Sequence, residues 1–290
     1  TLASVRANLP DEQVAFVASL TEKYQVPPST TKTFFNSVLR TPSYFEGQLQ
    51  ALLDSDTELV AFGVGLTPDA VKRLQAQGKL VGALIGSPHH FDAYRGLDLD
   101  FIVAQGTEAG AHTGQIGTMV MVPEIVQMAG DMPVLAAGGI GHGSQIAGAL
   151  SMGAQGVWLG TTWLSSREHS QGDHAVSDNL RAKLFAAGSG DTAITRGSSG
   201  KPQRQIRSAW TEAWAAPDAP PTLKMPYQHA LVGELLTAID DHEIDQLVHS
   251  PAGQGIGWST SERSIADIMA DLAHQTAIGL KRGIATLDEG

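Results

Sequence analysis

A strand–helix unit repeats through the middle of the chain, between residues 58 and 161, and this repeat limits the possible folds more than any other feature. Each unit has a short apolar run that ends in glycine or another small residue, followed by a helical pattern. The runs are ELVAFGVG (58–65), LVGALIGS (80–87), LDFIVAQG (99–106), PVLAAGGI (133–140) and GVWLGT (156–161). Short apolar strands that alternate with single helices predict parallel βαβ units in a sheet covered on both faces. Consecutive units without a reversal of order favour a (β/α)8-type barrel over a doubly wound sheet.

Local signals define the connecting helices. In TPDAVKRLQAQG, Thr67 is the expected N-cap, Pro68 occupies the first helical position and Gly78 ends the helix. A second helix, GSQIAGALSMG, ends at Gly153. We identify five strands where a barrel needs eight, so three strands are either hidden in atypical sequence or missing from the N-terminal part of the chain.

The rest of the chain divides into segments that differ from this repeat. Residues 1–57 form a helical N-terminal segment without a convincing strand, and the βα units occupy residues 58–166. Residues 167–250 contain glycine-rich turns and the proline-rich stretch AAPDAPPTLKMP, which predict a small second domain or lid. In residues 251–290 we expect a C-terminal helix that returns to the barrel and is capped by Ser261.

Composition excludes several classes of function. The net charge of −11, without a cluster of Lys or Arg, argues against nucleic-acid and anionic-membrane partners. No apolar run reaches the roughly 18 to 20 residues that span a bilayer, and the first residues do not resemble a signal peptide, so we expect a cytoplasmic protein. The sequence has no Cys, no HxH or HxxxH spacing and no G-x-S-x-G motif. We therefore expect neither a metal site nor a Cys or Ser nucleophile.

Two neighbouring strands end in glycine-rich sequence, at AAGGI and WLGT. In a barrel the carboxyl ends of the strands carry the chemistry, and the last two loops often bind phosphate. Glycine lets the backbone approach a ligand, and N–H groups at the start of the next helix attract an anion. Gly138, Gly139, Gly160 and Thr161 thus predict a phosphate site. The alternative is that these glycines only form tight turns.

The stretch AQGTEAGAHTG (104–114) places His112 directly after a strand, among glycine and alanine residues that cannot bury it. A histidine in such a position favours a catalytic role over a structural one. Glu108 is either its partner or a cap for the loop, and we favour the cap. His142 is a weaker candidate that could face an anion, and His89 and His90 are weaker still.

Together AQGTEAGAHTG, MPVLAAGGIGHG, GAQGVWLGTTWL, MPYQHAL and AGQGIG resemble the nitronate monooxygenases, formerly called 2-nitropropane dioxygenases, which are FMN-dependent (β/α)8 barrels. The resemblance covers about residues 58–276. It implies that His112 is the general base or binds the anionic nitronate, and that Gly253 and Gln254 close the site. The implied FMN contacts are Gln105, Gly110, Gly138, Gly139, Trp158, Leu159, Gly160 and Thr161. Where the family usually reads EAGGH, this chain has Ala111 before His112.

The implied reaction is oxidation of small alkyl nitronates with O2 to a carbonyl compound and nitrite. Family members carry three strands ahead of the one at residues 58–65, and none is visible here, which agrees with our count of five. One alternative is the related flavin-dependent enoyl-acyl-carrier-protein reductase, which needs a reduced nicotinamide. Another is a non-catalytic remnant of a barrel. The oligomeric state and the physiological substrate cannot be read from the sequence.

Overall fold

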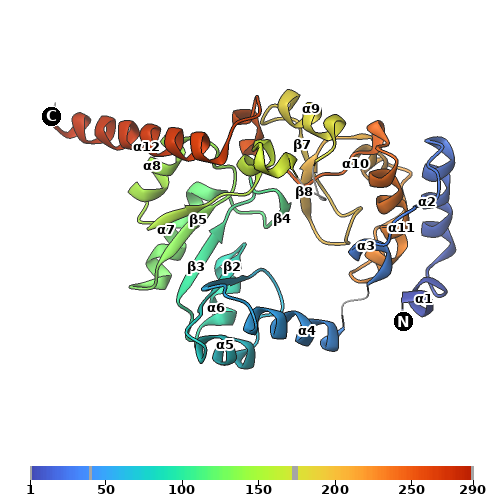
Figure 1. Ribbon diagram of the computed structural model, residues 1–290, viewed down its shortest axis with the longest axis horizontal. Helices are drawn as coiled ribbons and strands as arrows, with labels where there is room; N and C mark the ends of the chain where they lie inside the picture. The colour runs from blue at the N-terminus through green and yellow to red at the C-terminus, as the bar shows by residue number, and fades with distance from the viewer. Residues whose placement is uncertain (1, 39–40, 172–175, 289–290) are drawn as a thin grey trace.

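The computed structural model describes residues 2–38, 41–171 and 176–288, and its centre is a parallel sheet of five strands (Figure 1). The strands follow the order β1-β2-β3-β5-β6. Their bounds are β1 (Leu59–Phe62), β2 (Leu80–Ile85), β3 (Phe101–Gln105), β5 (Val134–Ala137) and β6 (Gly156–Trp158). Each lies within one of the apolar runs that predicted it. The prediction of a parallel α/β sheet is therefore confirmed.

Four helices connect these strands: α5 (Pro68–Gln75), α6 (Pro88–Tyr94), α7 (Thr118–Ala129) and α8 (Gly143–Ser151). The predicted start of α5 is confirmed, because Thr67 Oγ1 accepts a hydrogen bond of 3.2 Å from Ala70 N and Pro68 is the first helical residue. Gly78, which follows α5, has φ of +77°, a left-handed conformation that glycine adopts without strain. Local residue choice thus explains where this helix begins and ends.

Alternation along the strands sends apolar side chains to both faces of the sheet. On β2, Val81, Ala83 and Ile85 are completely buried in the core that lies under α5 to α8 and α4 (Pro42–Leu53). Complete burial of a side chain such as Ile85 contributes about 1.5–3 kcal/mol. The opposite face carries a smaller cluster that includes Phe101 and Val103. This second face points toward the site described below.

A second, antiparallel sheet was not predicted. It has the order β4-β8-β7, and its strands are β4 (Ala111–His112), β7 (Thr192–Thr195) and β8 (Gln203–Ile206). Its strands are short, and β8 has the polar sequence QRQI, so neither length nor hydrophobic alternation marks it. The pairing of Ala111 with Arg204 joins positions far apart in the chain, which a local pattern cannot show.

The N-terminal helices lie at the far side of the molecule from the parallel sheet (Figure 1). Helices α1 (Leu2–Arg6), α2 (Asp11–Lys23) and α3 (Phe34–Ser37) pack against α11 (Tyr227–Asp241). The core there includes Trp210 of α10 (Ala209–Ala215), which is fully buried. Residues 2–38 and 41–57 contain no strand, as predicted. Helix α4 instead packs beside α5.

The long helix α12 (Ile265–Asp288) packs along α8 and extends beyond it in Figure 1. The contact needs glycine, because a Cβ on Gly143 would lie 2.4 Å from Gln275 Cβ. The predicted cap at Ser261 is wrong: Ser264 Oγ accepts a 3.0 Å hydrogen bond from Asp267 N, directly before the helix begins. The remaining elements are α9 (Asp178–Ala186), η1 (Thr161–Ser165), η2 (Glu168–Ser170), η3 (Asp245–Leu247) and η4 (Gln254–Trp258). Within the described ranges, no helix has both the length and the apolar character needed to cross a membrane.

Candidate active site

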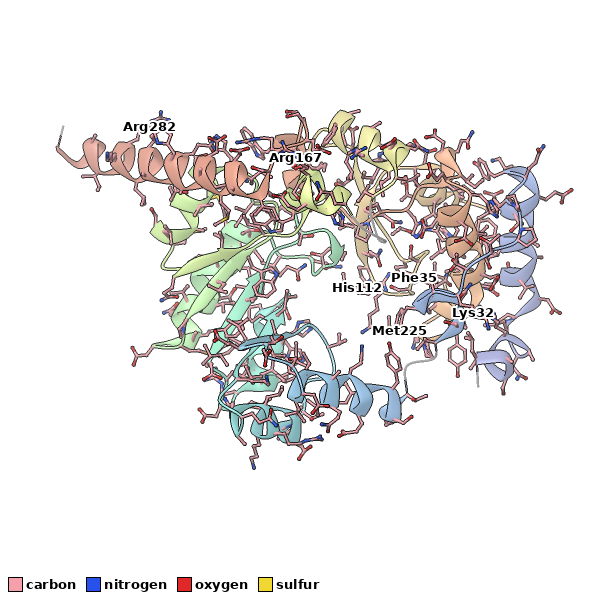
Figure 2. All side chains as sticks on the ribbon, in the orientation of Figure 1. Lys32, Phe35, His112, Arg167, Met225 and Arg282 are labelled. Atoms are coloured by element: carbon pink, nitrogen blue, oxygen red, sulfur yellow. The ribbon has the colours of Figure 1, made fainter. Side chains whose placement is uncertain are left out.

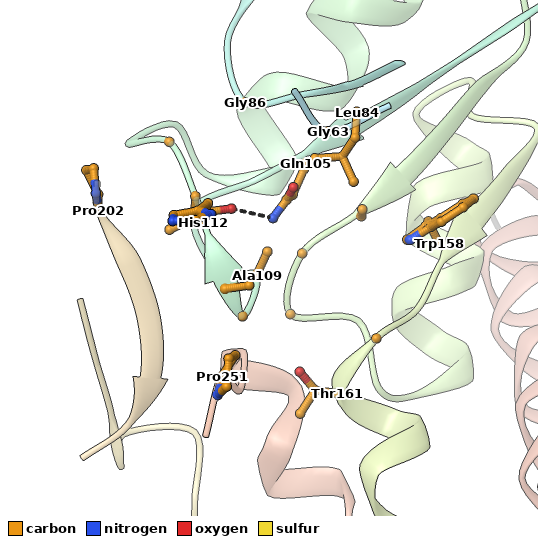
Figure 3. A pocket seen from close by; sticks show the side chains of 18 of the residues that line it. Gly63, Leu84, Gly86, Gln105, Ala109, His112, Trp158, Thr161, Pro202 and Pro251 are labelled. Carbon is orange, nitrogen blue, oxygen red and sulfur yellow. Dashed lines mark hydrogen bonds between the residues drawn. The ribbon is translucent and has the colours of Figure 1, made fainter. Parts of the chain in front are cut away.

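A cavity of about 770 Å³ lies at the carboxyl ends of the parallel strands, between them and the β4-β8-β7 sheet (Figure 3). Its volume is in the range of small-molecule and cofactor sites. One rung of the parallel ladder crosses its floor, because Gln105 pairs with Ala137, Ala137 pairs with Trp158, and all three line the cavity. Figure 2 shows His112 and Met225 at the edge of the opening between the two halves of the molecule.

The cavity brings together most of the site residues expected from the sequence. The residues that line it are Gln105, Gly110, His112, Gly138, Gly139, Trp158, Gly160 and Thr161. Leu159 does not line it, because its side chain packs against the core under the helices. His90, a weaker candidate, also lines the cavity, and its Nδ1 accepts a hydrogen bond of 3.3 Å from Gly86 N.

One side of the cavity consists of Gly138, Gly139, Gly160 and Thr161, which we term the glycine wall. Gly138 and Gly139 have φ of +111° and +67°. A Cβ on Gly139 would lie 2.7 Å from Glu108 Cβ, whereas a Cβ on Gly160 would meet nothing within 4 Å. No hydrogen bond within the described residues uses the backbone N–H of Gly139, Gly160 or Thr161. Open space and unused donors together form a cradle for an anion.

The start of α8, by contrast, is closed by the protein's own side chains. Gln145 Oε1 accepts hydrogen bonds from Gly141 N and His142 N, at 2.9 and 3.1 Å. Gln275 Oε1 accepts a third from Gly143 N at 3.0 Å, and His142 Nδ1 accepts a fourth from Ser144 N at 3.1 Å. The structure therefore gives His142 a capping role, and its ring lies 4.4 Å from that of Trp258.

The opposite side is lined by His112, Lys201 and Pro202, and the buried Ser199 lies behind it against His112. We term these four residues the histidine wall. His112 Nε2 lies 2.7 Å from Ser199 Oγ, and Gln105 Nε2 donates a 3.0 Å hydrogen bond to the His112 carbonyl oxygen. The His112 side chain is nevertheless exposed to the cavity. Backbone and ring are thus both held, and the imidazole faces a space that a ligand can enter.

Glu108 is committed to structure rather than to His112. Its carboxylate accepts hydrogen bonds from Thr118 N at 3.0 Å and Thr118 Oγ1 at 2.8 Å, and so caps the start of α7. Beneath the same loop, Arg204 donates from Nε and Nη2 to the Thr107 carbonyl oxygen, both at 3.0 Å. Burial lowers the pKa of Arg204, and the charge of Glu108 opposes that shift. These contacts fix the loop that carries His112.

Sequence reasoning missed part of the histidine wall. Ser199, Lys201 and Pro202 come from the connection between β7 and β8, where RGSSGKPQ indicated only turns. Met225 and Pro251, which also line the cavity, lie in or next to stretches that carried the family resemblance. Gly253 and Gln254 do not line it. Their N–H groups donate to Thr161 Oγ1 and to the Glu108 carbonyl oxygen, both at 2.8 Å, so this segment holds Thr161 of the glycine wall and the loop that leads to His112.

Comparison with protein families gives a consistent answer. The family model described as nitronate monooxygenase matches residues 9–275. A candidate monooxygenase of Mycobacterium tuberculosis is 37% identical over 280 residues, covering 93% of this chain and 73% of that protein. A candidate nitronate monooxygenase of Bacillus subtilis is 28% identical over 263 residues, covering 87% and 74%.

Solved structures share the fold. Nitroalkane oxidase from Streptomyces ansochromogenes superimposes with a TM-score of 0.77 at 26% identity, over 93% of this chain and 77% of that one. FabK from Thermotoga maritima superimposes with a TM-score of 0.69 at 24% identity, over 88% and 77%. At its lower identity, the FabK likeness is evidence for the α/β fold alone.

Proposed function

The chain belongs to the nitronate monooxygenase family of flavin-dependent oxidoreductases, and we propose that it uses FMN to oxidise small alkyl nitronates with O2 to a carbonyl compound and nitrite. One observation carries the proposal: a cradle of unused N–H groups and an accessible histidine face each other across one cavity. Such a cavity suits a phosphate-bearing cofactor on one side and a small reacting molecule on the other.

The glycine wall fits the phosphate of FMN. Gly139, Gly160 and Thr161 offer backbone N–H groups, and open space at Gly160 leaves room for the phosphate oxygens. The sequence has no G-x-G-x-x-G motif after a strand, which is why we propose FMN rather than FAD. When bound, FMN would accept electrons from the substrate and pass them to O2.

In this proposal, the substrate binds and exchanges its proton at the histidine wall. His112 either removes a proton from a nitroalkane or binds the nitronate oxygens, and both roles need a ring that faces the cavity. Ser199 and Gln105 restrict the ring and its backbone, so His112 keeps one orientation. Such restraint reduces the entropy lost when the reacting groups are brought into position.

We propose on the same premise that the five-stranded sheet is an arc of a (β/α)8-type barrel and that residues 167–250 form its lid. Parallel strands in unbroken order, with helices α5 to α8 on one face and a site at the carboxyl ends, support the barrel. The contribution of the β7–β8 connection to the cavity supports the lid. The helical segment 1–57 and the C-terminal segment 251–290 complete the proposed division.

The experiment begins with the purified protein and its flavin. Release of the cofactor by heating, followed by chromatography, is expected to give FMN, and recovery of FAD would contradict the proposal. O2 consumption with propyl-2-nitronate is the expected activity. NADH consumption driven by an enoyl thioester would support an enoyl-acyl-carrier-protein reductase instead. A protein without flavin absorbance, even after FMN is added, would support the non-catalytic remnant.

A further inference from the structure

The side chains that line the cavity among the described residues include a positive charge and no negative charge. Among the described residues that line it, Lys201 has the only side chain with a fixed charge, and no Asp or Glu is present. His90 and His112 are the other side chains there that can become cationic. The whole chain, by contrast, carries a net charge of −11. An anion approaching the protein is therefore repelled at long range and attracted only inside the cavity.

Lys201 lies on the histidine wall, away from the glycine wall. In Figure 3 its neighbour Pro202 lies on the side of His112, whereas Trp158 and Thr161 lie across the cavity. Lys201 N donates a 3.3 Å hydrogen bond to Ser199 Oγ, the same oxygen that lies 2.7 Å from His112 Nε2. One short loop thus positions both an imidazole and an ammonium group on the substrate side.

The ammonium group of Lys201 has no partner among the residues that the structure describes. No ion pair or hydrogen bond of its Nζ is found in residues 2–38, 41–171 or 176–288, and the side chain is exposed. Lys79 shows the contrast, because its buried Nζ donates to the carbonyl oxygens of Ser55 and Thr57 at 2.7 and 2.8 Å. Lys79 has a structural function that is absent for Lys201.

We propose that Lys201 binds the negative charge of the substrate and thereby selects anionic nitronates over neutral nitroalkanes. The inference rests on the proposed function and assigns a specificity-determining residue to it. A nitronate carries a full negative charge on its oxygens, which an ammonium group attracts strongly in a partly enclosed site. A neutral nitroalkane gains much less from the same contact. Removal of Lys201 therefore weakens binding of the anion selectively.

The test uses holoenzyme variants and an anion that does not react. Nitrate is planar, carries one negative charge and resembles the nitronate group, and its binding is followed by the change in the visible flavin spectrum. The variants are Lys201→Met, Lys201→Arg and the matched control Lys224→Met. Lys224 is an exposed lysine directly before Met225 that does not line the cavity, so its loss changes the net charge equally.

The expected result is that Lys201→Met raises the nitrate Kd about tenfold, equivalent to about 1.4 kcal/mol. Lys201→Arg stays within about threefold of wild type, because it keeps the charge, and Lys224→Met leaves the Kd unchanged. The ratio of kcat/KM for propyl-2-nitronate to that for 2-nitropropane should fall by a similar factor in Lys201→Met alone.

Three outcomes of the nitrate titration would overturn the inference: an unchanged nitrate Kd in Lys201→Met, an equal rise in Lys224→Met, or no binding of nitrate to wild-type holoenzyme. Loss of flavin from Lys201→Met would also overturn it, because that would place the lysine at the cofactor. Failure of the proposed function has a different signature. In that case wild type oxidises no nitronate, while the nitrate titration still reports on Lys201.

Discussion

The two walls of the cavity are built in different ways. The glycine wall uses backbone N–H groups at the ends of two adjacent parallel strands, and the absence of side chains creates its shape. The histidine wall uses side chains from β4 and from the connection that leads into β8, two distant parts of the chain that the pairing of β4 with β8 brings together. Under the proposed function the two sheets would have different tasks: the parallel sheet would hold the cofactor, and the second sheet would select the substrate and carry the catalytic residue.

The largest expected effect separates chemistry from cofactor binding. If His112 is the general base, His112→Asn should lower kcat with the neutral substrate 2-nitropropane by about 10² to 10⁴, while the bound flavin spectrum and the melting temperature stay unchanged. The pH profile of kcat should lose one ionisation. Normal turnover with a lower melting temperature would instead make His112 a structural residue and break the division between the walls.

Gly160→Leu tests the other wall. The added side chain enters the open cradle and would displace the phosphate from more than one backbone N–H group. A hydrogen bond to a charged group contributes about 1.5–3 kcal/mol. The FMN Kd should therefore rise at least about 100-fold. Flavin titration of the apoprotein measures it. Gly190→Leu is the matched control, because a Cβ there also meets nothing within 4 Å and the residue does not line the cavity. Equal flavin affinity in both variants would place the phosphate elsewhere.

Adjacent serines sharpen the comparison within the histidine wall. Ser199→Ala should lower kcat about tenfold and change its pH profile without affecting the FMN Kd, because the His112 ring loses its contact with Ser199 Oγ. Ser198 Oγ instead accepts a 3.2 Å hydrogen bond from the buried Trp210 Nε1. Ser198→Ala should therefore reduce the free energy of unfolding by about 1 kcal/mol and leave the pH profile intact. The reverse pattern would mean that Ser199 has no role in positioning His112.

The smallest effect concerns Ala111, which has φ of +60° in the position where the family usually has glycine. A non-glycine residue in this conformation costs about 1–2 kcal/mol, partly offset by the flexibility of glycine in the unfolded chain. Ala111→Gly should raise the free energy of unfolding by about 0.5–1 kcal/mol in urea denaturation. Ala216→Gly, at φ of −64°, is the control and should not stabilise the protein.

The sequence was sufficient for the regular part of the molecule. The parallel strands, the Thr67 cap and the glycine wall follow from local residue choice, because hydrophobic runs and glycine positions express their structure within a few residues. His112 could be singled out for the same reason, because it lies in the glycine-rich stretch that follows the predicted strand at residues 99–106.

The histidine wall as a whole could not be predicted. Ser199 approaches His112 only because β8 pairs with β4, and such pairing depends on tertiary packing rather than on a pattern within β8. The predicted cap of α12 was wrong because the sequence pattern does not locate the first residue of a helix to within three positions. Ser261 and Ser264 both precede the helical pattern, and only the bond between Ser264 and Asp267 distinguishes them.

The closed start of α8 has a consequence for the protein without its cofactor. Because Gln145, His142 and Gln275 already occupy the N–H groups of residues 141–144, departure of the proposed phosphate would leave no unpaired helix end beside the glycine wall. The apoprotein should therefore keep the geometry of the empty cradle, and rebinding would not require a helix to reform. Gln275 belongs to α12, so this helix would hold the start of α8, beside the proposed cofactor site, in place while FMN leaves and binds again.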